Sequence, residues 1–309
     1  YLTKVADSKG NFISYEYSKV DNQVYPLAIT YTNHSLEGLE VPGILKVQFN
    51  LEDRTDRAMS AKYGFMLTTT KRVSNVEVSV GEVVVGRYNL EYQQQSVNRR
   101  SRLASVEYIG YDLTGRNEIS DGGMGFEYES IGATDLLTKI TQNTGGQTKV
   151  SYKSSAQYRD DNGGNLNPHM PFAVQTVEKI EYDDRNGQVW ENTFEYAGGW
   201  YYYNGPMDRR FVGFEKVVRT DDAGNAVATF YHQGNGANVA YGELLGDWAK
   251  AGKIYKSELR DSEGNLFTQA LNKWEFDRFP GVGGAEDRSF AKLSASVTKV
   301  FDGDSTHKD

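Results

Sequence analysis

The feature that most constrains the fold is a short turn pattern, Asp-x-x-Gly followed by Asn or Gln, which recurs between strand-like segments. Aspartate at the start of a type I turn accepts hydrogen bonds from the turn's backbone N–H groups, and glycine three residues later adopts positive φ. Each copy therefore predicts the tip of a β-hairpin, with its glycine at positive φ or at a bulge. Three copies lie in the second half of the chain: Asp184 with Gly187, Asp221 with Gly224, and Asp261 with Gly264.

The segments between these turns alternate between apolar and polar residues. In `VEVSVGEVVVGRYNLEYQQ`, Val76, Val78 and Val80 fall on one face, while Glu77 and Ser79 fall on the other. The 21 Tyr and 32 Gly, against 6 Pro, are typical of strands and turns. The sequence predicts an all-β protein, an extended curved antiparallel sheet of long hairpins with little helix. The best helix candidate is residues 53–67, `DRTDRAMSAKYGFML`.

The composition argues against several classes of function. The net charge of −8 gives the chain no overall attraction for nucleic acid phosphates. Cysteine is absent, which excludes disulfides and thiolate metal sites. No apolar run approaches the roughly 18 residues that a membrane-spanning helix needs, so no direct membrane span is expected, and we expect no cofactor.

Domain organisation is indicated by one polar segment rich in Gly and Asn, residues 154–171. It predicts a loop between an N-terminal β segment, residues 1–155, and a hairpin segment, residues 156–309, which we expect to be continuous with the first. The chain opens directly on strand-like sequence with Tyr1. We therefore expect it to be a fragment of a larger protein.

Several motifs resemble a known family. `YDLTGR`, residues 111–116, resembles the Tyr-Asp repeat of RHS/YD-repeat proteins. `DLLTKITQNTGGQTKVSYK` and `RRFVGFEKV` follow in the order found in that family. From about Val73 to the C-terminus, the chain resembles the B component of Tc insecticidal toxin complexes and the non-catalytic part of the Salmonella virulence plasmid B protein. The family's core motif corresponds here to Arg209, Arg210, Phe211, Gly213 and Phe214.

The resemblance implies a structural role. In that family such segments border a β-propeller and precede tandem repeats that wind into a hollow β-shell around a toxic C-terminal effector. The implied function is therefore a shell or scaffold segment of a large bacterial toxin or surface protein, secreted or at the cell surface, that helps to enclose or deliver a C-terminal effector. The implied partners are other segments of the same polypeptide, the effector, or a partner toxin subunit. The sequence itself shows neither propeller repeats, nor a self-cleavage motif, nor an effector.

Catalysis has little support in the sequence, and we expect no enzyme activity. The four histidines, His34, His169, His232 and His307, accompany neither cysteine nor a G-x-S-x-G elbow. `FEYES` places Glu127 and Glu129 two residues apart, as in the E-x-E pair of ADP-ribosyltransferases. Strand alternation explains the spacing more simply, because Phe126 and Tyr128 would then face inward.

Two clusters suggest binding sites. Asp160, Asp161, Asp302 and Asp304 supply grouped oxygens, but they lack the spacing of a calcium loop, and we interpret them as turn residues. In `AGGWYYYNGP`, Trp200 and Tyr202 would share one face of a strand and could stack on a glycan. This supports the alternative function, a surface adhesin or a carbohydrate- or protein-binding β module. Buried packing of these rings is the favoured interpretation.

Overall fold

The computed structural model describes residues 1–95, 99–112, 114, 117–129, 135–246, 248–281 and 288–301. These residues form antiparallel strands, and their helical content is two single turns, η1 (Ser155–Gln157) and η2 (Val239–Tyr241). The chain divides into two compact units, unit 1 (Tyr1–Thr148) and unit 2 (Lys149–Asp309). The predicted all-β class is confirmed. No helix in the described part of the chain is long and apolar enough to cross a membrane.

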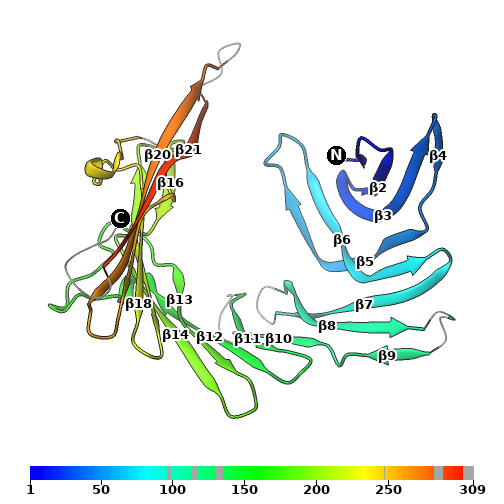
Figure 1. Ribbon diagram of the computed structural model, residues 1–309, viewed down its shortest axis with the longest axis horizontal. Coiled ribbons are helices and arrows are strands. Elements are labelled where there is room, and N and C mark those ends of the chain that lie inside the picture. The colour runs from blue at the N-terminus through cyan, green and yellow to red at the C-terminus, as the bar shows by residue number, and fades with distance from the viewer. Residues whose placement is uncertain are drawn as a thin grey trace. The chain divides into compact units, whose positions relative to one another are not determined.

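Unit 1 is an antiparallel meander (Figure 1). β2 pairs with β1 and β3, and pairing then proceeds from β3 through β5, β6, β7 and β8, with the short β4 and β9 added to β3 and β8. β10 pairs with both β8 and β11. The bounds are β1 (Lys4–Ala6), β2 (Asn11–Val20), β3 (Gln23–Leu36), β4 (Leu39–Val41), β5 (Leu45–Ser60), β6 (Leu67–Val80), β7 (Val83–Gln94), β8 (Ser101–Tyr111), β9 (Glu118–Ser120), β10 (Met124–Tyr128) and β11 (Leu137–Thr141).

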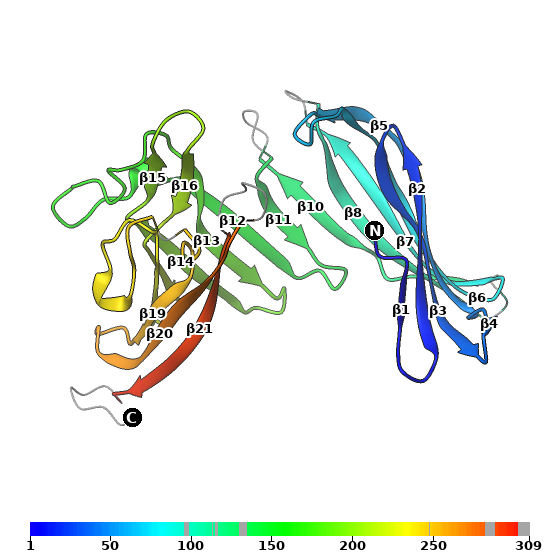
Figure 2. The ribbon, with the colours of Figure 1, turned by 90° about the horizontal axis from the view of Figure 1, so that it is seen from above.

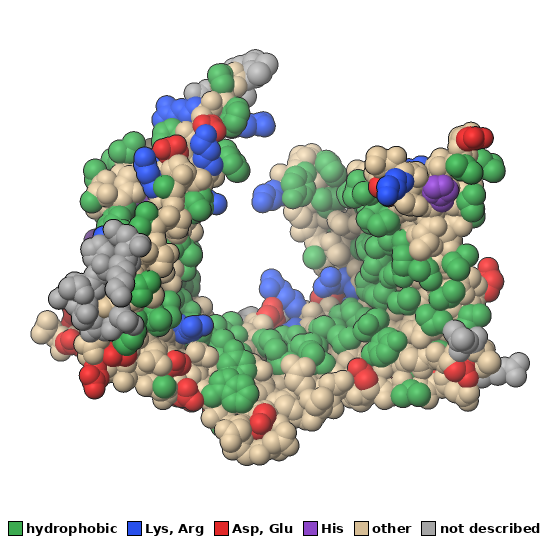
Figure 3. Space-filling model, in the orientation of Figure 1, with side chains coloured by type: hydrophobic (Ala, Val, Ile, Leu, Met, Phe, Trp, Pro, Cys, Tyr) green, Lys and Arg blue, Asp and Glu red, His purple; other side chains and the backbone are tan. Residues whose placement is uncertain are grey.

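The sheet of unit 1 buries few side chains. Among the described residues of this unit, the buried apolar ones are Phe12, Tyr25 and Ala28. Hydrophobic side chains gather visibly over the middle of the unit in the space-filling view (Figure 3). A single-layered sheet cannot cover both of its faces, so it presents apolar surface of the kind that marks interaction sites.

The prediction of a helix over residues 53–67 is wrong. β5 continues to Ser60 and β6 begins at Leu67, so this segment is mostly strand. The pairing of β5 with β6 is interrupted by a bulge: Asp53 pairs with Lys71 and Ala58 with Thr69, which leaves residues 54–57 opposite Thr70 alone. The extra residues break the strand alternation in the sequence, and this is why the segment resembled a helix.

The Tyr25 side chain supplies hydrogen bonds that the pairing of β5 with β6 lacks at the bulge. Its hydroxyl accepts hydrogen bonds from the backbone N of Thr70, at 2.9 Å, and of Lys71, at 3.2 Å. Tyr25 lies on β3, whereas Thr70 lies on β6, which is separated from β3 by β5 in the order of pairing. The bulge therefore lets a side chain of β3 satisfy backbone donors of β6 that would otherwise be buried without a partner.

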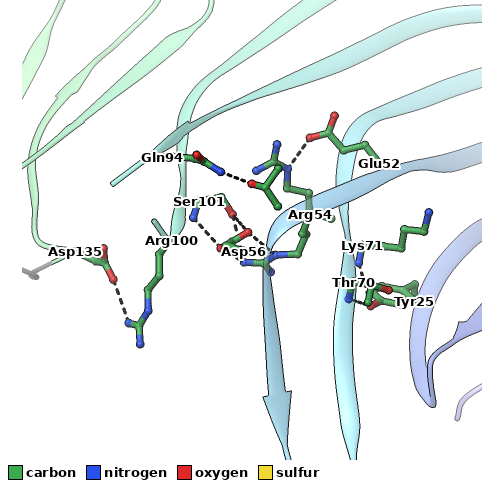
Figure 4. A network of polar contacts seen from close by, with 12 residues as sticks. Tyr25, Glu52, Arg54, Asp56, Thr70, Lys71, Gln94, Arg100, Ser101 and Asp135 are labelled. Atoms are coloured by element: carbon green, nitrogen blue, oxygen red, sulfur yellow. Dashed lines mark hydrogen bonds and ion pairs between the residues drawn. The ribbon is translucent and has the colours of Figure 1, made fainter. Parts of the chain in front are cut away.

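Asp56, within the bulge, points away from β6 toward the start of β8 (Figure 4). Its carboxylate accepts hydrogen bonds from the backbone N of Ser101, at 2.7 Å, from Ser101 Oγ, at 2.8 Å, and from the Arg54 guanidinium, at 2.8 Å. The Asp56 side chain is 8% exposed. These hydrogen bonds, that of Arg54 first, hold the pKa of Asp56 well below its usual range.

Unit 2 contains a second meander. Antiparallel pairing runs from β13 through β14, β17, β18, β19 and β20 to β21, and β15 pairs with β16 as a separate hairpin. Neither unit's sheet closes on itself among the described strands. The bounds are β12 (Gln147–Ser154), β13 (Gln175–Asp183), β14 (Val189–Ala197), β15 (Trp200–Tyr203), β16 (Arg209–Gly213), β17 (Lys216–Asp221), β18 (Ala226–Tyr231), β19 (Ile254–Arg260), β20 (Leu266–Phe279) and β21 (Arg288–Val300).

The last hairpin of unit 2 extends beyond its neighbour. β19 pairs with β20 only from Leu266 to Leu271, whereas β20 pairs with β21 as far as Phe279. Residues 272–279 and 288–296, here called the arm, therefore form a two-stranded ribbon that projects past β19 (Figure 1). β21 pairs with no other described strand, so its outer edge carries unpaired backbone groups.

Candidate functional site

The two ends of the strands in unit 2 differ in their connections. At one end, tight Asp-x-x-Gly turns join β13 to β14, β17 to β18 and β19 to β20. At the other end lie three long connections: loop 1 (residues 155–174), loop 2 (residues 198–215, which contains β15 and β16) and loop 3 (residues 232–253). Long loops held by a rigid scaffold are a common location of function, so these loops form the candidate site (Figure 2).

The tight turns have the geometry that their sequence predicts. Gly187, Gly224 and Gly264 have φ of 97°, 84° and 87°. At the Asp221 turn, Asp221 Oδ1 accepts from the backbone N of Asn225 at 2.8 Å, and the N–H of Gly224 donates to the Asp221 carbonyl oxygen at 3.0 Å. The Asn225 side chain also donates to Asp221 Oδ2, and this bond is the main cause of the lowered pKa of Asp221.

The same arrangement holds at the other two turns. Asp261 Oδ1 accepts from the backbone N of Asn265 at 2.8 Å, and Asp184 Oδ1 accepts from that of Gln188 at 3.0 Å. The hydrogen bond from the Asn265 side chain is likewise the main cause of the lowered pKa of Asp261. Of the related `YDLTGR` sequence, Leu113, Gly115 and Arg116 lie outside the described residues.

Loop 1 is joined to loop 2 by a buried asparagine. Asn167 is 3% exposed, and its side-chain nitrogen donates to the carbonyl oxygens of Ser155, at 2.9 Å, and Tyr196, at 3.0 Å. Its side-chain oxygen accepts from the backbone N of Gly199 at 2.8 Å. All of the heavy polar atoms of this side chain are therefore engaged, and the start of loop 2 is fixed against loop 1.

Loop 3 is joined to loop 2 by a buried glutamine. The side-chain nitrogen of Gln233 donates to the carbonyl oxygens of Gly198, at 2.7 Å, and Gly213, at 3.0 Å. These two glycines lie at the beginning and near the end of loop 2, so one amide closes that loop and ties it to loop 3. Farther along loop 3, the Asn238 side chain donates to Glu215 Oε1 at 3.2 Å.

A buried carboxylate shapes loop 3 itself. Glu243 has no exposed surface, and it accepts hydrogen bonds from the backbone N–H groups of Gln233 (2.5 Å), Gly234 (2.6 Å) and Asn238 (2.9 Å). Successive backbone N–H groups that converge in this way form an anion-binding concavity, which here holds a side chain of the same loop. His232 Nδ1 lies 3.9 Å from Glu243 Oε1.

The residues of the family core motif lie in loop 2 and contact loop 3. Arg210 lies over Trp248, with its guanidinium carbon 4.4 Å from the ring centroid, and pairs with Asp208 at 3.2 Å. Phe211 and Phe214 contact each other edge to face at 5.8 Å. Gly213 has φ of 97° and presents its carbonyl oxygen to Gln233. Arg209 is exposed.

Trp200 and Tyr202 face other parts of the protein. Trp248 of loop 3 stacks on Trp200 with ring centroids 6.2 Å apart and contacts Tyr202 at 4.5 Å. The Tyr202 hydroxyl donates to Asp208 at 3.1 Å. The two rings therefore help to join loop 2 to loop 3, and binding of a glycan by them stays a prediction.

The remaining sequence candidates form no shared site among the described residues. Glu127 pairs with Lys139 at 2.7 Å across β10 and β11. Asp160 accepts hydrogen bonds from the backbone N of Asn162 and of Gly164, as in a turn. Asp302, Asp304 and His307 lie outside the described residues. No group of three or more His, Asp or Glu side chains in the described ranges has metal-binding geometry.

Sequence reasoning missed the three side chains that connect the loops, Asn167, Gln233 and Glu243. Each lies in or beside a Gly-rich loop segment, such as `GGNLNP` or `HQGNGAN`. A polar residue among glycines in a long loop is a usable signal, because closely packed loop backbones need side-chain partners for their amides. The pattern does not reveal which of the polar residues is buried.

The chain is an all-β protein of long antiparallel hairpins in open sheets, with loops that are hydrogen-bonded to one another at one end of unit 2. Residues 126–235 match the family model described as "Insecticide toxin TcdB middle/N-terminal region". Over these residues, which include Asn167, the core motif and Gln233, the resemblance to the B component of Tc toxins is confirmed. No curated protein matches the chain.

Solved structures extend the likeness to the fold of almost the whole chain. The crystal structure of TcdB2-TccC3 aligns with a TM-score of 0.76 at 10% identity, covering 97% of this chain and 35% of that chain. The Photorhabdus luminescens Tc holotoxin pore aligns with a TM-score of 0.76, and TcdB2-TccC3-Cdc42 with 0.73, each at 10% identity and covering 97% of this chain and 34% of the other. The chain thus spans about a third of the length of the solved chains that it resembles.

Proposed function

We propose that the chain is a wall segment of a secreted bacterial toxin shell of the RHS/Tc-B type, which helps to enclose or deliver a C-terminal effector. The observation that carries this proposal is the open meander ending in β21, whose outer edge has no partner strand among the described residues. Exposed edges promote uncontrolled pairing, and a protein with a long one normally covers it. A wall that continues into further strands would do so.

The distribution of apolar side chains supports the same role. In β21, which is 13 residues long, Phe290 is 63% exposed, Leu293 50% and Val297 48%. Much of the apolar surface of this strand is therefore left uncovered within unit 2. The proposed partners are therefore other segments of the same large polypeptide, the effector, or a partner toxin subunit.

The interlocked loops fit a structural role because their polar atoms are directed at one another. Glu243 accepts from backbone donors of its own loop, and Gln233 binds carbonyl groups of loop 2. We propose that this cluster stiffens one rim of the wall, and that the chain as a whole carries no catalytic activity. An NAD-consumption assay with an acceptor protein tests the latter. Turnover that a Glu129→Gln variant abolished would refute it.

Hydrogen exchange tests the wall proposal. In an antiparallel edge strand, alternate amides point outward and exchange readily unless another strand pairs with them. We expect the outward amides of β21 to exchange fast in the 309-residue chain and slowly in the complete gene product. The amides of β19, which pair on both sides in the chain alone, serve as the control. Equal exchange of β21 in both proteins would contradict the proposal.

A further inference from the structure

A groove of about 900 Å³ lies between loop 3 and the β20–β21 hairpin in unit 2. Tyr241 of loop 3 forms one wall, and Leu271, Trp274, Phe276 and Val297 of the hairpin form most of the apolar remainder. The groove follows β20 from Leu271 to Asp277, a stretch about 20 Å long at strand spacing. Its extension along one strand suits an extended polypeptide segment.

The groove runs along the part of β20 where β19 has ended. Beyond Leu271, the edge of β20 that faced β19 has no partner strand among the described residues. Two side chains instead donate to the first residue of β19: Trp274 Nε1 donates to the carbonyl oxygen of Ile254 at 2.8 Å, and the Asn272 side chain donates to the same oxygen at 3.1 Å. This holds Trp274 in place as a fixed wall of the groove.

The arm beside the groove is poorly covered. Phe279 is 55% exposed, and Phe290, on the facing strand of the arm, is 63% exposed. A two-stranded ribbon is marginally stable in water unless a third strand or another layer packs on it. A polypeptide segment packed against the arm would therefore stabilise it, and the groove is the concave surface at which such a segment can bind.

The charged side chains that line the groove indicate the kind of partner that can bind there. Two carboxylates line the groove, and each is paired with a lysine: Glu275 with Lys273 at 3.3 Å, and Asp277 with Lys292 at 3.0 Å. Lys299 also lines the groove, and no described carboxylate pairs with it. The strand that carries it, β21, contains Arg288, Lys292 and Lys299 and no acidic residue. The surplus is positive in a chain whose net charge is −8.

We propose that this groove binds an extended segment of the same, longer polypeptide, with apolar side chains that face Trp274 and Val297 and a carboxylate that faces Lys299. The inference rests on the proposed function as part of a larger wall. The solved chains of similar fold are about three times as long as this one, so a segment supplied in cis has room to reach the groove and a high effective concentration there. A second copy is disfavoured, because its own β21 is basic.

Cysteine accessibility tests the proposal cleanly, because the chain contains no cysteine. Ala295 is small, exposed and lines the groove. We expect Ala295→Cys to react with a fluorescent maleimide about tenfold or more slowly in the complete gene product than in the 309-residue chain. Ser262→Cys, on the exposed turn between β19 and β20, is the control and should react equally in both.

A charge reversal tests the chemistry of the occupant. Lys299→Glu should restore fast labelling of Ala295→Cys in the complete gene product, with unchanged circular dichroism and Tm. Slow labelling that Lys299→Glu leaves unaffected would overturn the acidic character of the segment. Equal labelling in the two proteins would overturn the proposal itself. If β21 amides were nevertheless protected there, the wall would stand and only the groove would be unoccupied.

Discussion

Asp56 on β5 accepts two hydrogen bonds from Ser101, the first residue of β8, although β6 and β7 lie between these strands in the order of pairing. A flat sheet would keep the two residues far apart, at about 4.8 Å per strand. The bulge in β5 and the bending of the sheet bring them together (Figure 4). The hydrogen bonds between Asp56 and Ser101 therefore stabilise the curvature of unit 1, in addition to strand twist.

Removing the Asp56 carboxylate should loosen unit 1. We expect Asp56→Ala to destabilise β5 and β8 by about 2 kcal/mol, because Arg54 and the Ser101 N–H would lose a buried charged partner. Hydrogen exchange resolved over β5 and β8 measures this. Glu40→Ala removes an exposed ion pair with Lys4 and should change stability by less than about 0.5 kcal/mol. Equal effects of the two variants would refute the role of Asp56.

The same carboxylate should make unit 1 sensitive to acid. The pKa of Asp56 is depressed in the folded state relative to its ordinary value of about 4. Its contribution to stability is therefore complete above about pH 4 and is lost as the pH falls from there toward the lower folded-state pKa. Asp56→Asn should flatten this acid-dependent loss, as measured by exchange of the β8 amides at pH 5 and pH 3. An unaltered pH dependence would contradict the prediction.

The hairpin turns allow a matched comparison of two glycines. Gly224 and Gly264 have similar positive φ, but a Cβ on Gly224 would lie 2.9 Å from Ser262 Cβ, whereas a Cβ on Gly264 would meet no atom within 4 Å. We expect Gly264→Ala to cost about 1 kcal/mol for its backbone conformation alone. Gly224→Ala should cost more. Thermal unfolding that ranked the two the other way would show that the contact between neighbouring tips is unimportant.

How far the sequence predicts the structure depends on how local the determinant is. The turns at Gly187, Gly224 and Gly264 were predictable, since each depends on five adjacent residues with one conformational solution. The bulge at residues 54–57 was not, because its extra residues are stabilised by Tyr25 and Ser101, which are distant in sequence. The contacts between the loops of unit 2 could not be predicted for the same reason, because Asn167 and Gln233 donate to carbonyl groups that are distant in sequence.

The glutamine that joins loops 2 and 3 should be essential for their order. Gln233→Ala would leave the part-buried carbonyl oxygen of Gly213 without this donor, and that of Gly198 with the Glu215 N–H alone, at a cost of about 1–2 kcal/mol. We expect limited proteolysis to cleave loops 2 and 3 faster in this variant. Gln188→Ala, on an exposed turn, is the control and should leave the cleavage pattern unchanged. Identical patterns in both variants would count against the interlocked loops.

The central claim, that this chain is a wall segment of a larger shell, is tested most directly by cryo-electron microscopy of the complete gene product. We expect a map in which residues 1–301 form part of a continuous wall, a further strand pairs with the outer edge of β21, and one face of the sheet lines an enclosed volume. A map in which β21 remains unpaired and both faces of its sheet contact bulk solvent would contradict the claim.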